Sequence, residues 1–284
     1  MPLPSPYSVF LHLFLNASLV LAGVALSVTL YSGGVTAVYT ALLVRLLLLL
    51  WFLEWGTRGK PLNGKRTLPQ ESFPGEFVSN MLVTVASDTL IVLVARPYVV
   101  PARFSLTEAL AFLPVSFLHE VVFDFFHYWG HRLCHEVPLL YRRVHKKHHT
   151  FHHPTVMITF YQDPSDLVLT NVLPFLAAFF LVRPRSALHL AQLMVTKSYT
   201  EMSGHVGREL FPSSSFPQCV WLPRLLSIEL YAEDHDNHHK LNDCNFSKRF
   251  CLWDKAFGTL YRPESLSQKS SDRKANSLSR DKRD

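Results

Sequence analysis

Long apolar blocks separated by polar segments dominate the pattern of this chain. Four blocks, residues 10–30, 35–53, 77–100 and 106–126, approach or exceed the roughly 20 apolar residues that a helix needs to cross a membrane. Two shorter blocks, 167–182 and 187–196, follow them. The pattern predicts an all-α, polytopic membrane bundle of about four spans, followed by a shallow hairpin that returns to the side from which it came.

Charged residues lie mainly between these blocks, and they set the expected orientation. The loop between the second and third blocks is basic, and basic loops usually face the cytosol. Counting spans from this loop places the N-terminus and everything after His127 on the cytosolic side. The net charge of +6 therefore fits cytosolic loops of a membrane protein and does not indicate a nucleic-acid partner. The ionisable residues inside the blocks are expected to face protein or to be paired; they are Arg45, Asp88, Glu108 and Glu120.

Composition divides the 284 residues into three segments. Residues 1–76 are expected to form an N-terminal membrane hairpin and its cytosolic loop, and residues 77–262 a histidine-rich domain. Residues 263–284 are a basic, Ser-rich tail that we expect to be disordered. No basic n-region precedes the first block, so we expect a retained span and not a removed signal peptide. The four cysteines form no CxxC pair, which argues against a zinc ribbon or a disulfide framework.

Histidine is the compositional outlier, because fifteen are present and all but His12 lie between His119 and His239. Eight of them form three clusters: His127 and His131; His145, His148 and His149; His235, His238 and His239. Residues at i, i+3 and i+4 project from one face of a helix, so each cluster can direct its imidazoles toward one point. Eight imidazoles exceed the about four to six ligands that one ion accepts, which predicts two metals in an all-histidine cage. Imidazole suits iron, zinc, copper and nickel alike, so the clusters do not name the metal.

The other histidines are expected to serve other purposes. His135 continues the stripe of His127 and His131 but lies about 12 Å along the helix from His127, so one ion cannot bind all three. We therefore expect His135 to support the site without binding metal. We expect His119 and His189 to be hydrogen-bonded core residues. We expect His152 and His153 to be solvated or to line the substrate site, and His12 to have no role.

Two carboxylates are predicted to assist catalysis next to the clusters. Ligating imidazoles usually donate their second N–H to a carboxylate or carbonyl. Asp124 lies one turn before His127, and Glu233 lies just before His235. Asp234 and Asp236 flank His235 too, but a water-exposed helix surface explains them nearly as well.

The order HxxxH, HxxHH, HxxHH, with apolar hairpins before and between the clusters, resembles the fatty acid hydroxylase and sterol desaturase superfamily. The supporting segments are HYWGHRLCH at 127–135, HKKHH at 145–149 and WDKAFGT at 253–259, the last close to the WDxxFGT of that family. Asn245-Phe246 follows the last cluster at the family's spacing. The resemblance covers about residues 77–262, which it identifies as a fatty acid hydroxylase-like catalytic domain.

The resemblance implies a membrane oxygenase with two Fe²⁺ ions that uses O₂ and electrons from NAD(P)H, delivered by cytochrome b5 and its reductase. It implies hydroxylation, methyl oxidation or desaturation of a sterol or fatty acyl lipid at the endoplasmic reticulum membrane, with the clusters facing the cytosol. His205, in a serine–glycine context, matches a further ligand of the family. The implied metal ligands are His127, His131, His145, His148, His149, His205, His235, His238 and His239.

One departure from the family pattern keeps other functions open. Many sterol-type members carry His-Pro where this chain has Asp163-Pro164, and a carboxylate there could bind a metal or hold a ligand. A metal transporter would need ionisable residues inside its spans, whereas these histidines lie outside them. A zinc-stabilised scaffold without catalysis is the other alternative. Reductase-dependent O₂ consumption separates the oxygenase from both.

Overall fold

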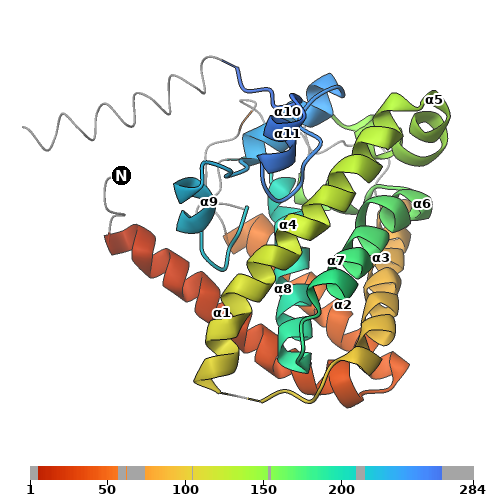
Figure 1. Cartoon of the computed structure of the whole chain (residues 1–284). Helices are drawn as coiled ribbons and strands as arrows, with labels where there is room; N and C mark the ends of the chain where they lie inside the picture. Colours follow the sequence, from red (N-terminus) through yellow and green to blue (C-terminus); the bar gives the residue numbers. More distant parts are fainter. Residues whose placement is uncertain are drawn as a thin grey trace, which may run out of the picture.

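The computed structural model describes residues 6–56, 62, 74–103, 105–152, 155–208 and 215–263. Across these residues the secondary structure is helical, apart from two isolated β-bridges (Figure 1). This confirms the predicted all-α class. The tail expected to be disordered lies outside the described residues from position 264 onward, as do most of the basic loop, His153 and the side chain of His12.

Three apolar helices form the first part of the bundle: α1 (Pro6–Ser32), α2 (Val35–Trp51) and α3 (Pro74–Ala95). Leucine and valine on their outer surfaces stay exposed, as expected for side chains that face lipid; Leu21 and Leu48 are examples. The turn between α1 and α2 requires glycine, because a Cβ on Gly33 would lie 2.5 Å from the backbone oxygen of Thr29.

Helix α4 (Leu106–Glu136) connects the membrane part to the histidines. Ser105, the residue before the helix, caps its N-terminus, because its side chain accepts the N–H of Glu108 at 3.2 Å. Its 31 residues carry the HYWGHRLCH segment beyond the apolar block. A short α5 (Pro138–Leu140), a π-helical turn (Tyr141–His145) and two 3₁₀ turns (His148–Thr150 and Val156–Phe160) follow.

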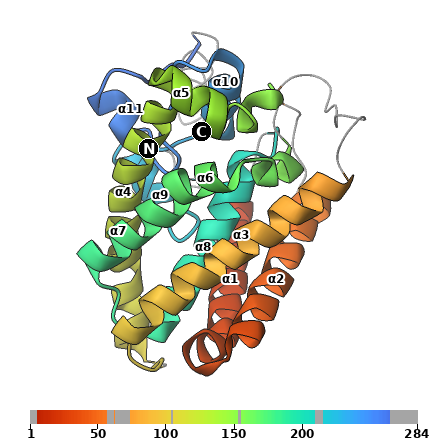
Figure 2. The same cartoon turned by 90° about the vertical axis from the view of Figure 1, so that its right-hand side faces the viewer.

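The predicted shallow hairpin has a longer first arm than its apolar block suggested. Helix α6 (Pro164–Leu167), a π-helical turn (Val168–Val172) and α7 (Leu173–Val182) follow one another without a break. Pro164–Val182 is a fifth helix long and apolar enough to cross a membrane, besides the four that were predicted. The second arm, α8 (Ala187–Gly204), is not among these candidate spans; it is buried along nearly its whole length and packs against α1 in the centre of the bundle (Figure 2).

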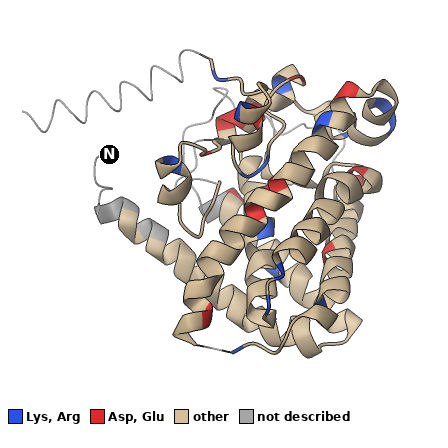
Figure 3. Cartoon of the chain, viewed as in Figure 1, with Lys and Arg blue, Asp and Glu red and all other residues tan. Residues whose placement is uncertain are grey.

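Helices α9 (Trp221–Leu225), α10 (Ala232–Leu241) and α11 (Leu252–Ala256) cover one end of the bundle. Figure 3 shows that charged residues gather at this end, whereas the opposite half of the helices carries few. The charge distribution therefore divides the molecule into an apolar part suited to lipid and a polar cap. The histidine clusters lie where the two parts meet.

Candidate metal centre

Nine buried or half-buried histidines converge in two groups. In each group one nitrogen from every imidazole lies within 4.8 Å of the others. The first group contains His131, His135, His145, His149 and His238, and the second contains His148, His205, His235 and His239. They come from α4, the turns after α5, the end of α8, and α10, so four separate segments build the centre.

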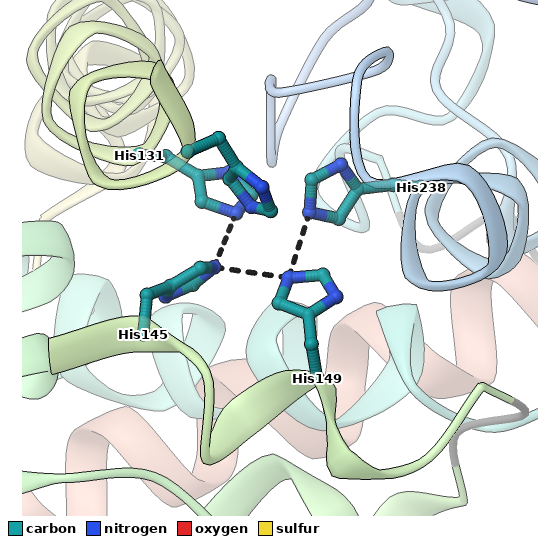
Figure 4. Close-up of side chains that lie close together, drawn as sticks. His131, His145, His149 and His238 are labelled. Atoms are coloured by element: carbon teal, nitrogen blue, oxygen red, sulfur yellow. Dashed lines mark hydrogen bonds between the residues drawn. The ribbon is translucent and has the colours of Figure 1, made fainter. Parts of the chain in front are cut away.

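The distances between these nitrogens are those of neighbouring ligands around a metal ion. In the first group, the Nε2 atoms of His131 and His145 lie 3.1 Å apart, those of His145 and His149 3.0 Å, and those of His149 and His238 3.2 Å (Figure 4). In the second group, the corresponding separations run from 2.9 to 3.4 Å. Imidazole binds a metal at about 2.0–2.1 Å, so neighbouring ligands at tetrahedral or octahedral angles lie roughly 2.8–3.4 Å apart.

The protonation of these imidazoles also favours a cation between them. His131 Nδ1 bonds to the backbone oxygen of Phe246 at 2.8 Å, and His145 Nδ1 bonds to Asp166 at 2.9 Å. A neutral imidazole that donates from Nδ1 carries a lone pair on Nε2. The facing Nε2 atoms of His131 and His145 would therefore be two acceptors at 3.1 Å, which repel each other unless a cation lies between them. The residues present fit a metal ion at each group.

Asp166 is a functional residue that sequence reasoning missed. It lies 21 residues after His145 and three after Asp163, the carboxylate that the sequence had indicated in this segment. Backbone oxygens hold three further imidazoles by their Nδ1 atoms: Glu201 holds His205, Cys244 holds His238 and Thr170 holds His127, at 2.6–2.8 Å. These partners fix the tautomer that leaves Nε2 free to bind a metal.

His127 and His135 exchange their expected places. His127 belongs to neither donor group, although its Nε2 atom is buried and has no hydrogen-bond partner. His135, expected only to support the site, lies in the first group with His131. Of the three histidines of the stripe, the first donor group contains the second and the third. Metal binding by His127 stays a prediction.

The two acidic residues predicted to be catalytic do not occupy equivalent positions. The Asp124 carboxylate makes no bond to His127; it accepts the backbone N–H groups of Lys248, Arg249 and Phe250 at 2.7–3.0 Å. Asp124 therefore fixes the chain after the last cluster. Glu233 lies half-buried in the first turn of α10, outside both donor groups, and its catalytic role stays a prediction. Asp163 is also outside both groups.

The WDKAFGT segment stabilises the loop that orients two of the imidazoles. Asp254 accepts the backbone N–H groups of Phe246 and Ser247 at 2.8 and 3.0 Å. The backbone oxygens of Cys244 and Phe246, in the same loop, hold His238 and His131. The Asp254 carboxylate in α11 therefore helps to position His131 and His238 of the first donor group through the backbone of this loop.

A close approach between α4 and the π-helical turn completes the wall of the centre. A Cβ on Gly130 would lie 3.1 Å from the backbone oxygen of Leu169, so only glycine allows this spacing without a shift. The next carbonyl along the turn, that of Thr170, reaches His127. Single π-helical turns are often found at functional sites, because they expose carbonyls that a regular helix would use internally.

Burial keeps the imidazoles of the cap neutral. Burial, followed by Lys248, lowers the pKa of His205 to about 3, and burial with neighbouring imidazoles lowers the pKa of His148 and His239 well below the usual value. Neutral imidazole is the form that binds metal.

The Lys248 Nζ atom lies 3.3 Å from His235 Nε2 and 3.9 Å from Glu201, and burial lowers the pKa of Lys248 to about 8.

A small cavity, partly open to the outside, adjoins both donor groups. His127, His131, His145, His148, His205 and His235 form its metal-side wall. Two sets of buried ion pairs surround it. Asp88 bonds to Arg45 at 2.6 Å and to Lys197 at 2.8 Å. Arg45 and Asp88, two of the ionisable residues inside the apolar blocks, are therefore paired as expected. Arg249 bonds to Glu120 and Glu201, both at 2.7 Å.

Comparison with known proteins places the centre in a family context. A family model described as fatty acid hydroxylase matches residues 116–259, half of the chain. Fatty acid hydroxylase vlmA of Lecanicillium sp is 35% identical over 152 residues, 50% of this chain and 40% of the relative. The C-4 methylsterol oxidase erg25 of Schizosaccharomyces pombe is 30% identical over 171 residues, 56% and 53% of the two chains.

A third relative is named for a different substrate. The very-long-chain aldehyde decarbonylase GL1-9 of rice, Oryza sativa, is 27% identical over 190 residues, 64% of each chain. This chain spans about half the length of the curated relatives that it matches. No solved structure matches it significantly.

Proposed function

This chain belongs to the fatty acid hydroxylase family, and we propose that it is a membrane-bound oxygenase that uses two iron ions and O₂ to oxidise a C–H bond of a lipid. We further propose that it acts at the endoplasmic reticulum membrane with its histidines facing the cytosol. Electrons would come from NAD(P)H through cytochrome b5 and its reductase. The relatives are named for fatty acids, methylsterols and long-chain aldehydes, so lipid is the class of substrate that they share.

One observation carries the proposal: two separate groups of neutral imidazoles present Nε2 atoms at the spacing of metal ligands. Two iron ions bound there would supply the activation of O₂ that an unactivated C–H bond requires. Asp166 and the backbone oxygens of Phe246, Cys244 and Glu201 hold four members of the donor groups in the tautomer that leaves Nε2 free, namely His145, His131, His238 and His205. Their burial keeps bulk water away from the site.

The position of the centre suits a lipid substrate. The cavity lies beside the donor groups and includes Leu46, Thr84 and Asp88 from the apolar helices α2 and α3. Those helices carry exposed apolar side chains, such as Leu48 and Leu90, on their outer surfaces. We propose that a lipid enters the cavity from the bilayer, so that its reacting carbon approaches the imidazoles without crossing the aqueous phase.

The proposal is tested by metal analysis and O₂ consumption of the full chain. The protein is purified in detergent after expression with iron, and its iron and zinc contents are measured per chain. About two iron atoms, with O₂ consumption that depends on NADH, cytochrome b5 and its reductase, are expected. Zinc that iron cannot replace on reconstitution, together with no reductase-dependent O₂ consumption, would support the non-catalytic scaffold and contradict the oxygenase.

A further inference from the structure

The cavity beside the histidines combines an apolar surface with many polar and charged side chains. Ligand cavities are lined mainly by apolar and aromatic side chains, with a few polar groups that fix orientation. Here, apart from the histidines, the apolar lining residues are Leu46, Phe160, Leu167 and Met202, and eleven others are polar or charged. A plain hydrocarbon segment at this position would leave the few unpaired polar atoms of this lining without a partner.

The charged members of the lining compensate one another. Asp88 is shared between Arg45 and Lys197, and Glu201 bonds to Arg249 with Lys248 close by. Both carboxylates thus already have cationic partners inside the protein. The cavity has no obvious unpaired cation for an anionic ligand, so its ligand should carry a neutral polar group.

Two neutral side chains of the lining have buried polar atoms without a hydrogen-bond partner. They are the hydroxyl of Thr159, in the 3₁₀ turn Val156–Phe160, and the amide oxygen of Asn171, in the π-helical turn. Each residue is only 7% exposed. A buried polar atom without a partner is costly, and native proteins keep few of them unless water or a ligand completes the site.

The chemistry of these atoms identifies the kind of group that would complete them. The Asn171 oxygen can only accept, and the unpaired oxygen of Asp166 in the same lining is also an acceptor. A carboxylate offers acceptors alone and would be repelled, whereas a hydroxyl group offers one donor and two acceptors. A hydroxyl can therefore donate to the Asn171 oxygen or accept from the Thr159 hydroxyl.

We propose that Thr159 and Asn171 bind the hydroxyl group of a lipid alcohol and so place a nearby carbon against the histidines. That the bound carbon is then oxidised rests on the proposed function; the binding itself does not. Both residues would select lipid alcohols over hydrocarbons, and neither belongs to the two donor groups.

The test compares matched lipids in protein variants that differ by single polar atoms. The full chain in phosphatidylcholine nanodiscs is assayed for binding of 1-hexadecanol against hexadecane, and of cholestanol against cholestane. The protein should bind one of the alcohols at least about tenfold more tightly than its hydrocarbon, the ratio expected when a buried polar site is left unpaired. Thr159→Val and Asn171→Leu should each reduce that ratio several-fold, and together bring it close to one.

Thr155→Val is the matched control. Thr155 also has a buried hydroxyl without a partner, four residues before Thr159, but it does not line the cavity. This variant should keep the ratio of the unmodified protein. None of the three substitutions should lower the melting temperature or the iron content, because none removes a bond present in the fold.

The outcomes separate this proposal from the proposed function. Equal binding of alcohol and hydrocarbon, or an unchanged ratio in Thr159→Val and Asn171→Leu, overturns the hydroxyl site and shows that water alone occupies it. If the ratio behaves as expected but reductase-dependent O₂ consumption is absent, the oxygenase fails and the hydroxyl site stands. If O₂ consumption is present but the ratio does not change, only the hydroxyl site fails.

Discussion

The part of the chain that matches the family model and the helices before it contribute differently to one site. All nine members of the donor groups lie within residues 116–259. Arg45 and the cavity residues Leu46, Thr84 and Asp88 belong to α2 and α3, outside that range. The matched half therefore supplies all the histidines of the donor groups and most of the cavity lining, and the preceding helices supply three further lining residues.

The buried polar groups of the donor groups and those around Asp88 find their partners in different ways. In the first donor group, the Nε2 lone pairs of His131 and His145 face each other, and a cation between them would satisfy both. Around Asp88, by contrast, two cations share one carboxylate, so the charges are satisfied within the protein. Loss of a ligand should therefore remove function, whereas loss of an ion-pair partner should remove stability.

The largest expected effect is the loss of a metal ligand. His148→Ala or His239→Ala should abolish activity and reduce bound metal by at least one atom per chain, while the protein still inserts into the membrane. Both residues lie in the four-membered second group, which has no spare donor. Metal analysis and product formation measure the effect, with His189→Gln, a buried histidine outside both groups, as the control. Full activity in either alanine variant would contradict the ligand assignment.

A smaller effect, on stability, is expected in the membrane part. Asp88→Asn removes the charge that Arg45 and Lys197 share, and breaking a buried ion pair costs about 3–5 kcal/mol. The melting temperature in detergent should fall markedly, and the fraction that stays folded should keep its iron. The triple variant Arg45→Met, Asp88→Leu, Lys197→Met should recover much of the stability, because no uncompensated charge remains. Loss of iron from folded Asp88→Asn protein would show that the two parts are not separable.

The loop that orients His131 and His238 should give a graded effect. Asp254→Asn weakens the bonds to the backbone of Phe246 and Ser247 and so loosens the carbonyls that hold the two imidazoles. Loss of such outer partners lowers metal affinity about 10–100-fold. Iron retention during titration with a chelator measures this. Unchanged retention would mean that Asp254 only packs the C-terminal segment.

The smallest effect should distinguish His127 from His135. Because His135 lies in the first group and His127 in neither, His135→Ala should weaken iron binding more than His127→Ala. The first group keeps four other donors, so the loss should be partial. Chelator titration of both variants under the same conditions gives the comparison. The reverse order would restore the ligand set implied by the family resemblance.

The sequence by itself determined the features that depend on local periodicity. Apolar blocks of spanning length predicted the helices of the bundle, because their length follows from the rise of one helix. The expectation that each histidine cluster points at one site was wrong for the second and third clusters: His148 is separated from His145 and His149, and His238 from His235 and His239, so each of these two clusters supplies both donor groups. The eight clustered histidines were predicted to form a cage, and seven of them lie in the donor groups. His205 was predicted only through the family resemblance.

Only the tertiary structure decided the contacts between distant segments. Asp166 holds His145 across 21 residues, and Asp124 bonds to a backbone segment more than 120 residues away instead of to its neighbour His127. His127 bonds to the backbone oxygen of Thr170 in the turn before α7, whereas His135 lies in the first donor group. Helical spacing limits which side chains can meet along one helix, but the packing of other helices selects which of them do.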